Sequence, residues 1–289
     1  MQMIDQVFPN KKQVPLEGLY LGERLMEMAA EMGRSLVITD YIADQNGVVA
    51  KAAKDGHFTV PAEIKNSSDW GRYQELMAQA DVIISTGSYF NRRAKDGAQE
   101  ILFQFEPGQA FEHLGQWRLA AGVEKRSPDV AIVSRDLNFE LPEALRESGR
   151  KIIIFTTDSV SNSDKARALR NADTFILGSG ETDVEGDRMI ATLDQEMGYR
   201  VIMMVSGPSI LKLLLAAKRM DRIYITEAQR TISFDDPGTV RTILSGGKKV
   251  SEHKDFHLTH QFIQNDVVTE DGSVMSQSFL RYDANDLWR

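Results

Sequence analysis

The 289-residue sequence contains no cysteine. This absence excludes disulfide bonds, zinc sites built on thiolates and a cysteine nucleophile, and it favours a reducing compartment. We therefore expect a cytoplasmic protein. With 42% hydrophobic residues, the chain has enough apolar material for one large core or two modest ones, so it does not need cross-links to fold.

Long apolar runs are also missing. No stretch reaches the length of about 18 apolar residues that a membrane-spanning helix needs. The first residues, MQMIDQVFPNKKQVPLEG, lack the apolar core of a signal peptide. The sequence therefore predicts a soluble protein with no membrane partner.

The sequence also lacks an excess of basic residues. Asp and Glu outnumber Lys and Arg by 42 to 34, which gives a formal net charge of -8. Because duplex binding draws on a clustered basic surface, we expect no nucleic-acid partner. An anionic ligand would have to be held by a few local donors and by the positive ends of helices, against an unfavourable overall field.

Several catalytic and cofactor motifs do not occur either. The sequence has no G-x-G-x-x-G fingerprint, P-loop, H-E-x-x-H or G-x-S-x-G elbow, and the Gly-Ser-Gly at 178–180 lacks the third glycine of the fingerprint. His253, His257 and His260 lie close together, but the spacing of the last two does not place them on one face of the strand expected there. We predict no metal site.

Seven short apolar runs, rich in Val and Ile and followed by small polar residues, have the pattern of buried strands. They are SLVITDYIA (35–43), DVIIST (81–86), DVAIVS (129–134), KIIIFTT (151–157), DTFILG (173–178), RVIMMVS (200–206) and DRIYIT (221–226). Apolar residues at helical spacing separate many of them. This alternation predicts an α/β fold with a mostly parallel, doubly wound sheet and helices on both faces. Ligands of such sheets bind at the carboxyl ends of the strands.

The two ends of the chain depart from this pattern. We predict an N-terminal extension with a helix over residues 1–33 and a single nucleotide-binding domain over 34–289. After about residue 245, two strand-like runs flank the turn-forming sequence EDGS (270–273), which predicts a C-terminal antiparallel hairpin. The segment 108–128 remains open between an inserted helix and a lid.

Small or polar residues follow four of the predicted strands, at 85–88, 134–136, 156–158 and 206–209. Such ends meet at one edge of a doubly wound sheet, where hydroxyl groups donate and each following helix presents free N–H groups to an anion. Together they predict a nucleotide site. The alternative is that these residues only cap helices and form turns. Arg135 favours the first interpretation, because an arginine can bind a ribose phosphate bidentately, although a surface ion pair is its other common role.

The order of these landmarks resembles the C-terminal reductase domain of the bifunctional riboflavin-biosynthesis deaminase/reductase, which is similar in fold to dihydrofolate reductase. The resemblance extends from about Ser35 to Tyr282. Its landmarks are ADQNGV after the first strand, SDW at 68–70, ELMAQADVIISTGS, PDVAIVSRD, VSGPSIL and DRIYIT. It identifies the chain as a divergent member of this family.

The resemblance implies a homodimeric, NADPH-dependent reductase of a ribosylaminopyrimidine or a related small heterocycle. By position, it implies cofactor contacts at Thr86, Gly87, Ser88, Ser134, Arg135, Thr157, Ser206, Gly207, Pro208 and Ser209. In this assignment, Arg135 lies near the adenosine phosphate and residues 206–209 lie under the pyrophosphate. Asn46, Ser68 and Trp70 are the implied substrate contacts. Their alternative roles are structural, since Ser68 could cap a helix and Trp70 could anchor it.

Three departures from the family pattern bear on the reaction. The sequence reads DQNG (44–47) where relatives have Ser-x-Asp-Gly, VSG (205–207) where they have Glu-Gly-Gly, and NRR (91–93) where they have an acidic pair. Asp44 is the candidate for a proton-relay or substrate-orienting group, because it follows the first strand, where substrate should meet cofactor. Its alternative role is that of a turn-forming aspartate.

Two main functions therefore stay open, and a different nucleotide-dependent enzyme, such as a sugar-nucleotide transferase, is a third and remoter alternative. The first is the reductase, in which the protein orients cofactor and substrate, excludes water and helps a proton to reach the product. The second is a nucleotide-binding protein of the same fold that has lost catalysis, and its motivation is the unusual Val205, Ser206 and Asn46.

Overall fold

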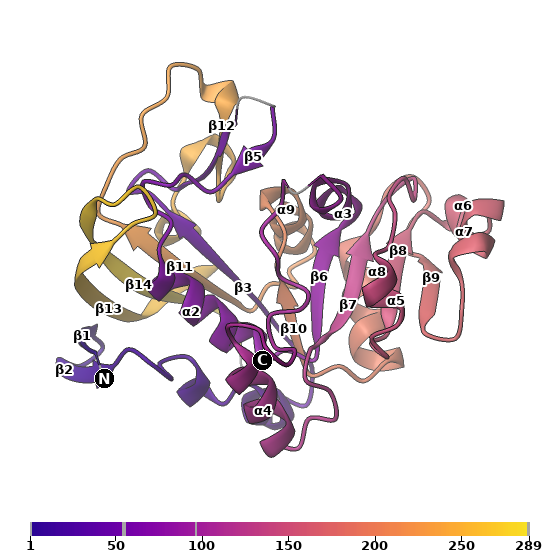
Figure 1. The fold of residues 1–289 in the computed structure, drawn as a ribbon, viewed down its shortest axis with the longest axis horizontal. Coiled ribbons are helices and arrows are strands. Elements are labelled where there is room, and N and C mark those ends of the chain that lie inside the picture. Colours follow the sequence, from indigo (N-terminus) through magenta and orange to yellow (C-terminus); the bar gives the residue numbers. More distant parts are fainter. Residues whose placement is uncertain (1, 54–55, 96, 288–289) are drawn as a thin grey trace.

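A computed structural model describes residues 2–53, 56–95 and 97–287 of the chain (Figure 1). Residues 1, 288 and 289, which end two of the predicted ranges, lie outside these described residues. Within them, one 11-stranded sheet has the order β2-β1-β13-β14-β11-β3-β10-β6-β7-β8-β9, and a separate three-stranded sheet has the order β12-β4-β5.

All seven predicted buried strands are present, and they lie side by side in parallel from β9 to β11. Their bounds are β3 (Leu36–Ala43), β6 (Val82–Thr86), β7 (Asp129–Val133), β8 (Ile152–Thr156), β9 (Thr174–Gly178), β10 (Val201–Met204) and β11 (Arg222–Ala228). The prediction of a mostly parallel sheet is confirmed. Since the runs are apolar on both faces, the strands inside the sheet are buried, whereas the edge strand β9 leaves Phe175 36% exposed.

The remaining strands of the large sheet are antiparallel. The predicted C-terminal hairpin is formed by β13 (Phe256–Val268) and β14 (Val274–Ala284), and β14 pairs with β11. Gly272 in its turn has a φ of +81°, a conformation that favours glycine. Beyond the hairpin, β1 (Met3–Phe8) pairs with β13, and β2 (Lys12–Pro15) pairs with β1. The first residues thus add two strands to the sheet, and the boundary after residue 33 stays a prediction.

Helices cover both faces of the sheet, as predicted. One face carries α1 (Leu25–Met32), α2 (Ser67–Met77), α3 (Gly87–Arg93), α4 (Glu112–Ala120), α5 (Glu143–Arg146) and α7 (Asp164–Leu169), which contribute buried residues to a single hydrophobic cluster. The other face carries α8 (Gly186–Ala191) and α9 (Pro208–Ala216). A short α6 (Asp158–Ser161) follows β8. The open segment 108–128 contains α4, whose Arg118 is buried and donates to the carbonyls of Ala78 and Ala80 at 2.8 and 2.6 Å.

The small sheet contains β12 (Val240–Thr242), β4 (Val48–Ala52) and β5 (Phe58–Thr59). Figure 1 shows β12 and β5 at the top of the view, above α3, which follows the carboxyl end of β6, and residues of β4 and β5 line a cavity together with the loop after β10. The small sheet therefore stands beside the edge at which the parallel strands end.

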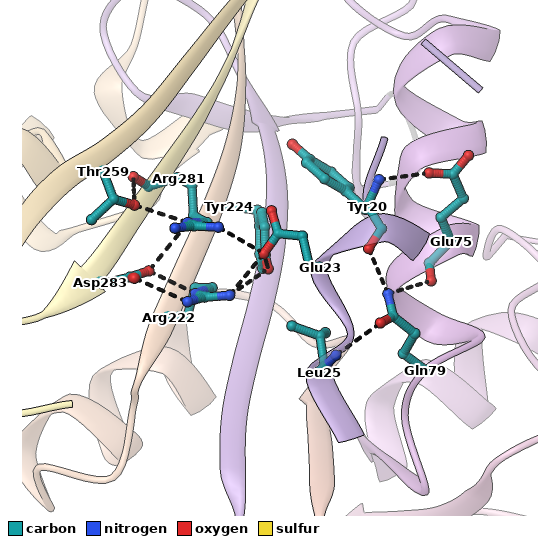
Figure 2. A network of polar contacts seen from close by, with 10 residues as sticks. All are labelled: Tyr20, Glu23, Leu25, Glu75, Gln79, Arg222, Tyr224, Thr259, Arg281 and Asp283. Atoms are coloured by element: carbon teal, nitrogen blue, oxygen red, sulfur yellow. Dashed lines mark hydrogen bonds and ion pairs between the residues drawn. The ribbon is translucent and has the colours of Figure 1, made fainter. Parts of the chain in front are cut away.

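A buried network of charged groups holds the chain that precedes α1 (Figure 2). Glu23 accepts hydrogen bonds from Arg222 at 2.7 Å and from Tyr224 at 2.6 Å, and its carboxylate lies 3.0 Å from the guanidinium of Arg281. Arg222 also donates to Asp283 twice, at 2.6 and 2.9 Å. Burial alone would lower the pKa of Arg222, but the charges of Tyr224, Glu23 and Asp283 outweigh it and raise that pKa. Each carboxylate of the network faces an arginine.

The same segment is tied to α2 on its other side. Glu75 accepts the backbone N–H groups of Gly18 at 2.7 Å and Tyr20 at 2.9 Å. Gln79 accepts the N–H of Leu25 at 3.0 Å and donates to the Tyr20 carbonyl at 2.7 Å. Figure 2 shows how residues 20–25 lie between α2 and the strands that carry the arginines. The segment thereby links the helical layer to the antiparallel strands.

Candidate active site

A cavity of about 540 Å³ opens at the carboxyl ends of β3 and β10. Its walls come from α2, α3, the small sheet and the loop before α9, and they include the aromatic side chains of Phe58, Trp70, Tyr73 and Tyr89. Trp70 and Tyr73 stack with ring centroids 5.0 Å apart and an interplanar angle of 15°. A cavity of this size with aromatic walls suits a small planar ligand.

Two buried aspartates line this cavity, Asp40 from β3 and Asp69 from α2. Their side chains are only 7% and 8% exposed, and the Oδ1 atom of each finds no hydrogen-bond partner among the described residues. Burial raises the pKa of Asp69 to about 6. Burial, and then the negative charge of Asp69, raises the pKa of Asp40 well above its usual range. Both pKa shifts therefore favour retention of a proton by the pair.

The start of α2 fixes where Asp69 lies. Asn66 caps the helix by accepting the backbone N–H of Asp69 at 2.9 Å. Asn66 is itself held, since its amide donates to Gln277 at 2.8 Å and to the Ile64 carbonyl at 3.0 Å. Because residues one helical turn apart share a face, Asp69 and Tyr73 both reach the cavity.

Cations lie around the cavity, but none of those in the described residues forms an ion pair with its aspartates. Arg92 donates to the Phe58 carbonyl at 3.0 Å and so connects α3 to β5 across the cavity. Lys65 pairs with Glu270 at 2.9 Å. Throughout the part of the chain that the structure describes, no arginine or lysine forms a salt bridge with either aspartate of the pair.

A second cavity, of about 360 Å³, shares Lys65, Asp69 and Trp70 with the first. It extends toward the N-terminus of α2 and the turn of the C-terminal hairpin, where Thr269 and Glu270 line it. Asp69 thus stands where the two cavities meet, and the combined space exceeds what a single planar ring would fill.

The predicted cofactor residues lie along one edge of the sheet. They follow β10, β6, β7 and β8, which are neighbours in that order. Thr86 and Thr157 cap α3 and α6, each accepting a backbone N–H at 3.4 Å, and Ser134 and Arg135 follow β7 between them. Ser88 and Ser209 are exposed in the first turns of α3 and α9. The structure therefore brings these residues to a common edge. It also shows that Thr86 and Thr157 cap helices, which is the structural role that the sequence left open for such residues.

The turn before α9 fits an anionic group. The Ser206 hydroxyl is buried without a partner among the described residues, and Gly207 begins α9 with no side-chain cap. A Cβ at Gly207 would meet nothing within 4 Å, so the turn is open. At Gly87, by contrast, a Cβ would lie 2.8 Å from the Phe139 ring. Packing therefore explains the glycine at 87, and the turn at 206–207 is the better phosphate cradle.

Asp44 lies outside the lining of the 540 Å³ cavity. One carboxylate oxygen accepts the N–H groups of Asn46 and Val48, both at 2.8 Å, and the other accepts the N–H of Ile232 at 2.8 Å. The side chain is 1% exposed. These contacts favour the alternative role that the sequence left open, a turn-forming aspartate.

The predicted substrate contacts are scattered rather than gathered. Trp70 lines the cavity, whereas Asn46 is exposed and stands apart from the cavity lining. Ser68 accepts a hydrogen bond from Gln264 at 2.9 Å, and the helix cap considered for Ser68 is supplied by Asn66 instead. The sequence reasoning missed the two buried aspartates. The available clue was a single carboxylate inside an otherwise apolar strand run, SLVITDYIA.

Two other sequence expectations concern the whole chain. Searching residues 2–53, 56–95 and 97–287 reveals no group of three or more His, Asp or Glu side chains arranged to hold a metal ion. The helices in the same ranges are all too short or too polar to span a membrane.

No protein-family model matches the chain, and no curated protein matches it in sequence. Solved structures share its fold at low identity. A pyrimidine reductase-like protein from Corynebacterium diphtheriae is 16% identical, with a TM-score of 0.60 and coverage of 94% of this chain and 99% of that one. A riboflavin biosynthesis reductase from Saccharomyces cerevisiae is 13% identical, with a TM-score of 0.51 and coverage of 91% and 99%.

A third similar structure is a bifunctional diaminohydroxyphosphoribosylaminopyrimidine deaminase and 5-amino-6-(5-phosphoribosylamino)uracil reductase from Thermotoga maritima. It is 12% identical, with a TM-score of 0.54, and the match covers 89% of this chain and 59% of that longer one. The chain therefore has the fold of the pyrimidine reductases, as its sequence landmarks predict.

Proposed function

We propose that this protein is an NADPH-dependent reductase of a small heterocyclic substrate, of the ribosylaminopyrimidine type. The observation that carries the proposal is the 540 Å³ cavity, which combines aromatic walls and a proton-holding aspartate pair with the open turn at 206–208. The cavity thus touches the edge along which the predicted cofactor residues lie. Reduction of a heterocycle by a nicotinamide needs a site for a planar ring and a proton source, both next to the bound cofactor.

The substrate ring would occupy the space between the Trp70–Tyr73 stack and Phe58. A ribosyl or ribityl group would extend into the adjoining 360 Å³ cavity beside Lys65 and Glu270. The arrangement supports a substrate with a flat head and a polar tail. The three similar reductases act, by their names, on pyrimidines or in riboflavin biosynthesis, and this agrees with that shape.

NADPH would lie along the strand-end row. Residues 206–209 would hold the pyrophosphate, and Arg135 would bind the 2′-phosphate, because its guanidinium is exposed and forms no ion pair within the described ranges. Thr86, Gly87, Ser88, Ser134 and Thr157 would line the rest of the row. When bound, the nicotinamide supplies a hydride.

The chain's own contribution to the reaction is a proton. The Asp40–Asp69 pair would hold it in the cavity, because burial raises the pKa of both groups and the charge of Asp69 raises that of Asp40 further. The pair would donate to the substrate atom next to the carbon that is reduced. We assign this role to the pair rather than to Asp44, whose oxygens are occupied by backbone N–H groups.

We also propose that the enzyme is cytoplasmic, as the absence of cysteine suggests, and that it works as a homodimer, as the sequence resemblance implies. Sedimentation velocity of the purified chain tests the assembly, with a single species of monomer mass contradicting it.

A non-catalytic nucleotide-binding protein is the second candidate. The observation that favours it is the turn before α9, where Val205 and Ser206 replace the acidic residue and glycine of the family pattern. The fold alone supports both candidates equally.

Fluorescence titration with NADPH and NADH separates the possibilities. We expect NADPH to bind, and Arg135→Ala to weaken NADPH by roughly tenfold while NADH changes little, since one charge-assisted phosphate contact is lost. Arg146→Ala, at an exposed arginine of α5, is the matched control. Failure to bind either nucleotide contradicts both candidates. Binding without oxidation of NADPH by any aminopyrimidine or pterin favours the second.

A further inference from the structure

A cavity on the opposite side of the α9 N-terminus has a different character from the candidate active site. It has a volume of about 570 Å³ and is bounded by α9 and the segment 240–255. Pro208 lines both this cavity and the 540 Å³ cavity. The start of α9 therefore separates two adjacent spaces, and the rest of this second lining belongs to neither the aspartate pair nor the aromatic wall.

The lining is strongly basic for a chain with a net charge of -8. Four cationic side chains contribute to it, Lys212, Arg241, Lys248 and Lys254, and Asp255 is the one carboxylate among its described lining residues. The imidazole of His253 also lines the cavity. A concave surface that gathers four positive charges focuses a positive potential, which attracts small anions even when the whole molecule repels them.

Three of these cations have no partner that would neutralise them. No hydrogen bond or ion pair is found for the side chains of Lys212, Lys248 or Lys254 across the ranges that the structure describes. Elsewhere the chain does pair its basic residues, for example Lys65 with Glu270 and Lys249 with Glu227. The cavity thus collects the lysines that the fold leaves without a counter-charge.

The fourth cation is held in place. Arg241 donates to the carbonyls of Gly238 and Val240 at 3.3 and 3.0 Å, and its guanidinium lies 3.7 Å from the centre of the Phe58 ring. A guanidinium fixed in this way keeps its charge and loses little freedom when an anion binds. Five residues further along the chain, Gly246 has a φ of +77°, a conformation that favours glycine, between the lining residues Ser245 and Lys248.

We propose that this basic cavity, defined by Lys212, Arg241, Lys248 and Lys254, is a binding site for a phosphate-type dianion. The ligand class is a phosphate or pyrophosphate group, because several lysines surround a tetrahedral anion without needing planar pairing. The first turn of α9, which has no side-chain cap, adds a positive helix end at Ser209. This proposal stands on the cavity itself and does not depend on the reductase activity.

The anion has two sources that the chemistry alone does not separate. It is either the phosphate of a larger ligand that passes Pro208 from the candidate active site, or a free phosphate or pyrophosphate ion. A phosphate of NADPH or of the substrate would couple the two cavities. A free ion would bind whether or not NADPH is present.

The test is isothermal titration of the full chain with pyrophosphate, and with inorganic phosphate, at low and moderate salt. We compare Lys212→Glu/Lys248→Glu with Lys11→Glu/Lys151→Glu, in which two exposed lysines far from the cavity change the net charge by the same amount. We expect the cavity variant to lose roughly tenfold or more in pyrophosphate affinity and the control to change by less than about twofold. The milder Lys212→Gln/Lys248→Gln should lie between them.

The proposal is overturned if the wild-type chain does not bind pyrophosphate, or if both charge-reversed variants weaken binding equally, since a diffuse field would then explain the affinity. A parallel NADPH titration identifies the source, because competition with pyrophosphate indicates a ligand phosphate and independent binding indicates a free ion. Pyrophosphate binding without NADPH binding would refute the reductase proposal and leave this one standing.

Discussion

Two pairs of carboxylates in the described residues are arranged in opposite ways. Glu23 and Asp283 lie between the antiparallel strands and the segment before α1, where Arg222 and Arg281 face both of them. Asp40 and Asp69 lie at the 540 Å³ cavity, with no arginine or lysine paired to either in the described structure. The first pair is balanced by ion pairs within the chain, whereas the second forms no ion pair and only the charge of Arg72 partly offsets that of Asp69.

This difference indicates which carboxylates stabilise the fold and which are available for a reaction. A buried carboxylate paired with arginine keeps its charge and orders the groups around it. A buried carboxylate without a cation lowers its cost by keeping a proton, and such perturbed groups gather at functional sites. The comparison therefore assigns the Glu23–Asp283 network to holding the N-terminal segment and the Asp40–Asp69 pair to the reaction.

Breaking the balanced network should have the largest effect. Arg222→Ala leaves Glu23 and Asp283 buried without their main counter-charge, so we expect a loss of about 3–5 kcal/mol in the free energy of unfolding, measured by urea denaturation. Arg24→Ala is the control, since the exposed Arg24–Glu27 pair should contribute less than about 0.5 kcal/mol. Equal losses in both variants would remove the distinction between the network and a surface pair.

Changing the unbalanced pair should impair the reaction instead. Asp69→Asn keeps the size of the side chain but removes its proton chemistry, so we expect kcat for the reduced substrate to fall about 100-fold or more while KM changes little. The pH profile of kcat should lose its decline at high pH. Asp164→Asn, at an exposed position of α7, should retain normal turnover. A variant of Asp69 with full turnover would exclude the pair as the proton source.

The same substitution should stabilise the fold. The unfolded chain ionises Asp69 near pH 4, whereas the folded chain keeps its proton up to about pH 6. Stability from this group is therefore complete below about pH 4 and falls as the pH rises from about 4 to 6. Asp69→Asn should remove this slope and gain on the order of 1–3 kcal/mol at pH 8. Urea denaturation across pH measures it, and an unchanged slope would contradict the raised pKa.

The smallest effect should come from Tyr20, which lies between the two pairs. Its hydroxyl is buried without a partner in the described ranges, and burial, then Asp40, then Glu23 raise the pKa of that hydroxyl. Tyr20→Phe removes an unsatisfied group, so we expect the free energy of unfolding to change by less than about 1 kcal/mol, in the stabilising direction. A shift of the kcat pH profile in this variant would show instead that the two pairs are coupled.

The sequence predicts the parallel half of the fold well because its strands are buried on both faces. An apolar run such as KIIIFTT has few alternatives in a globular protein, and all seven runs form strands. The C-terminal hairpin was also predictable, since the EDGS turn is a local signal. By contrast, β1 and β2 have mixed polar and apolar sequences, and the pairing of β1 with β13 depends on residues from a distant part of the chain.

The candidate active site was less predictable, because its residues are brought together by packing between distant segments. The strand-end turns are local features, so their positions on one edge follow from the strand order. Asp40 and Asp69 belong to a strand and to a helix, and only the packing of α2 beside β3 brings them to one cavity. The motif SDW drew attention to Ser68 and Trp70. Asp69, which lies between them, lines the cavity together with Trp70, whereas Ser68 does not. Asp44 attracted the catalytic prediction because its position after the first strand was visible, whereas its three backbone partners were not.

The pairing of β1 with β13 also sets a limit on how this molecule can be assembled. Asp5 lies opposite Ile263, so one edge of the sheet joins residues from opposite ends of the chain. During synthesis β1 leaves the ribosome long before its partner strand exists, and pairings between such distant residues slow folding. We therefore expect the parallel strands to form first and the edge to close last. Until then β1 and β2 have no sheet to join.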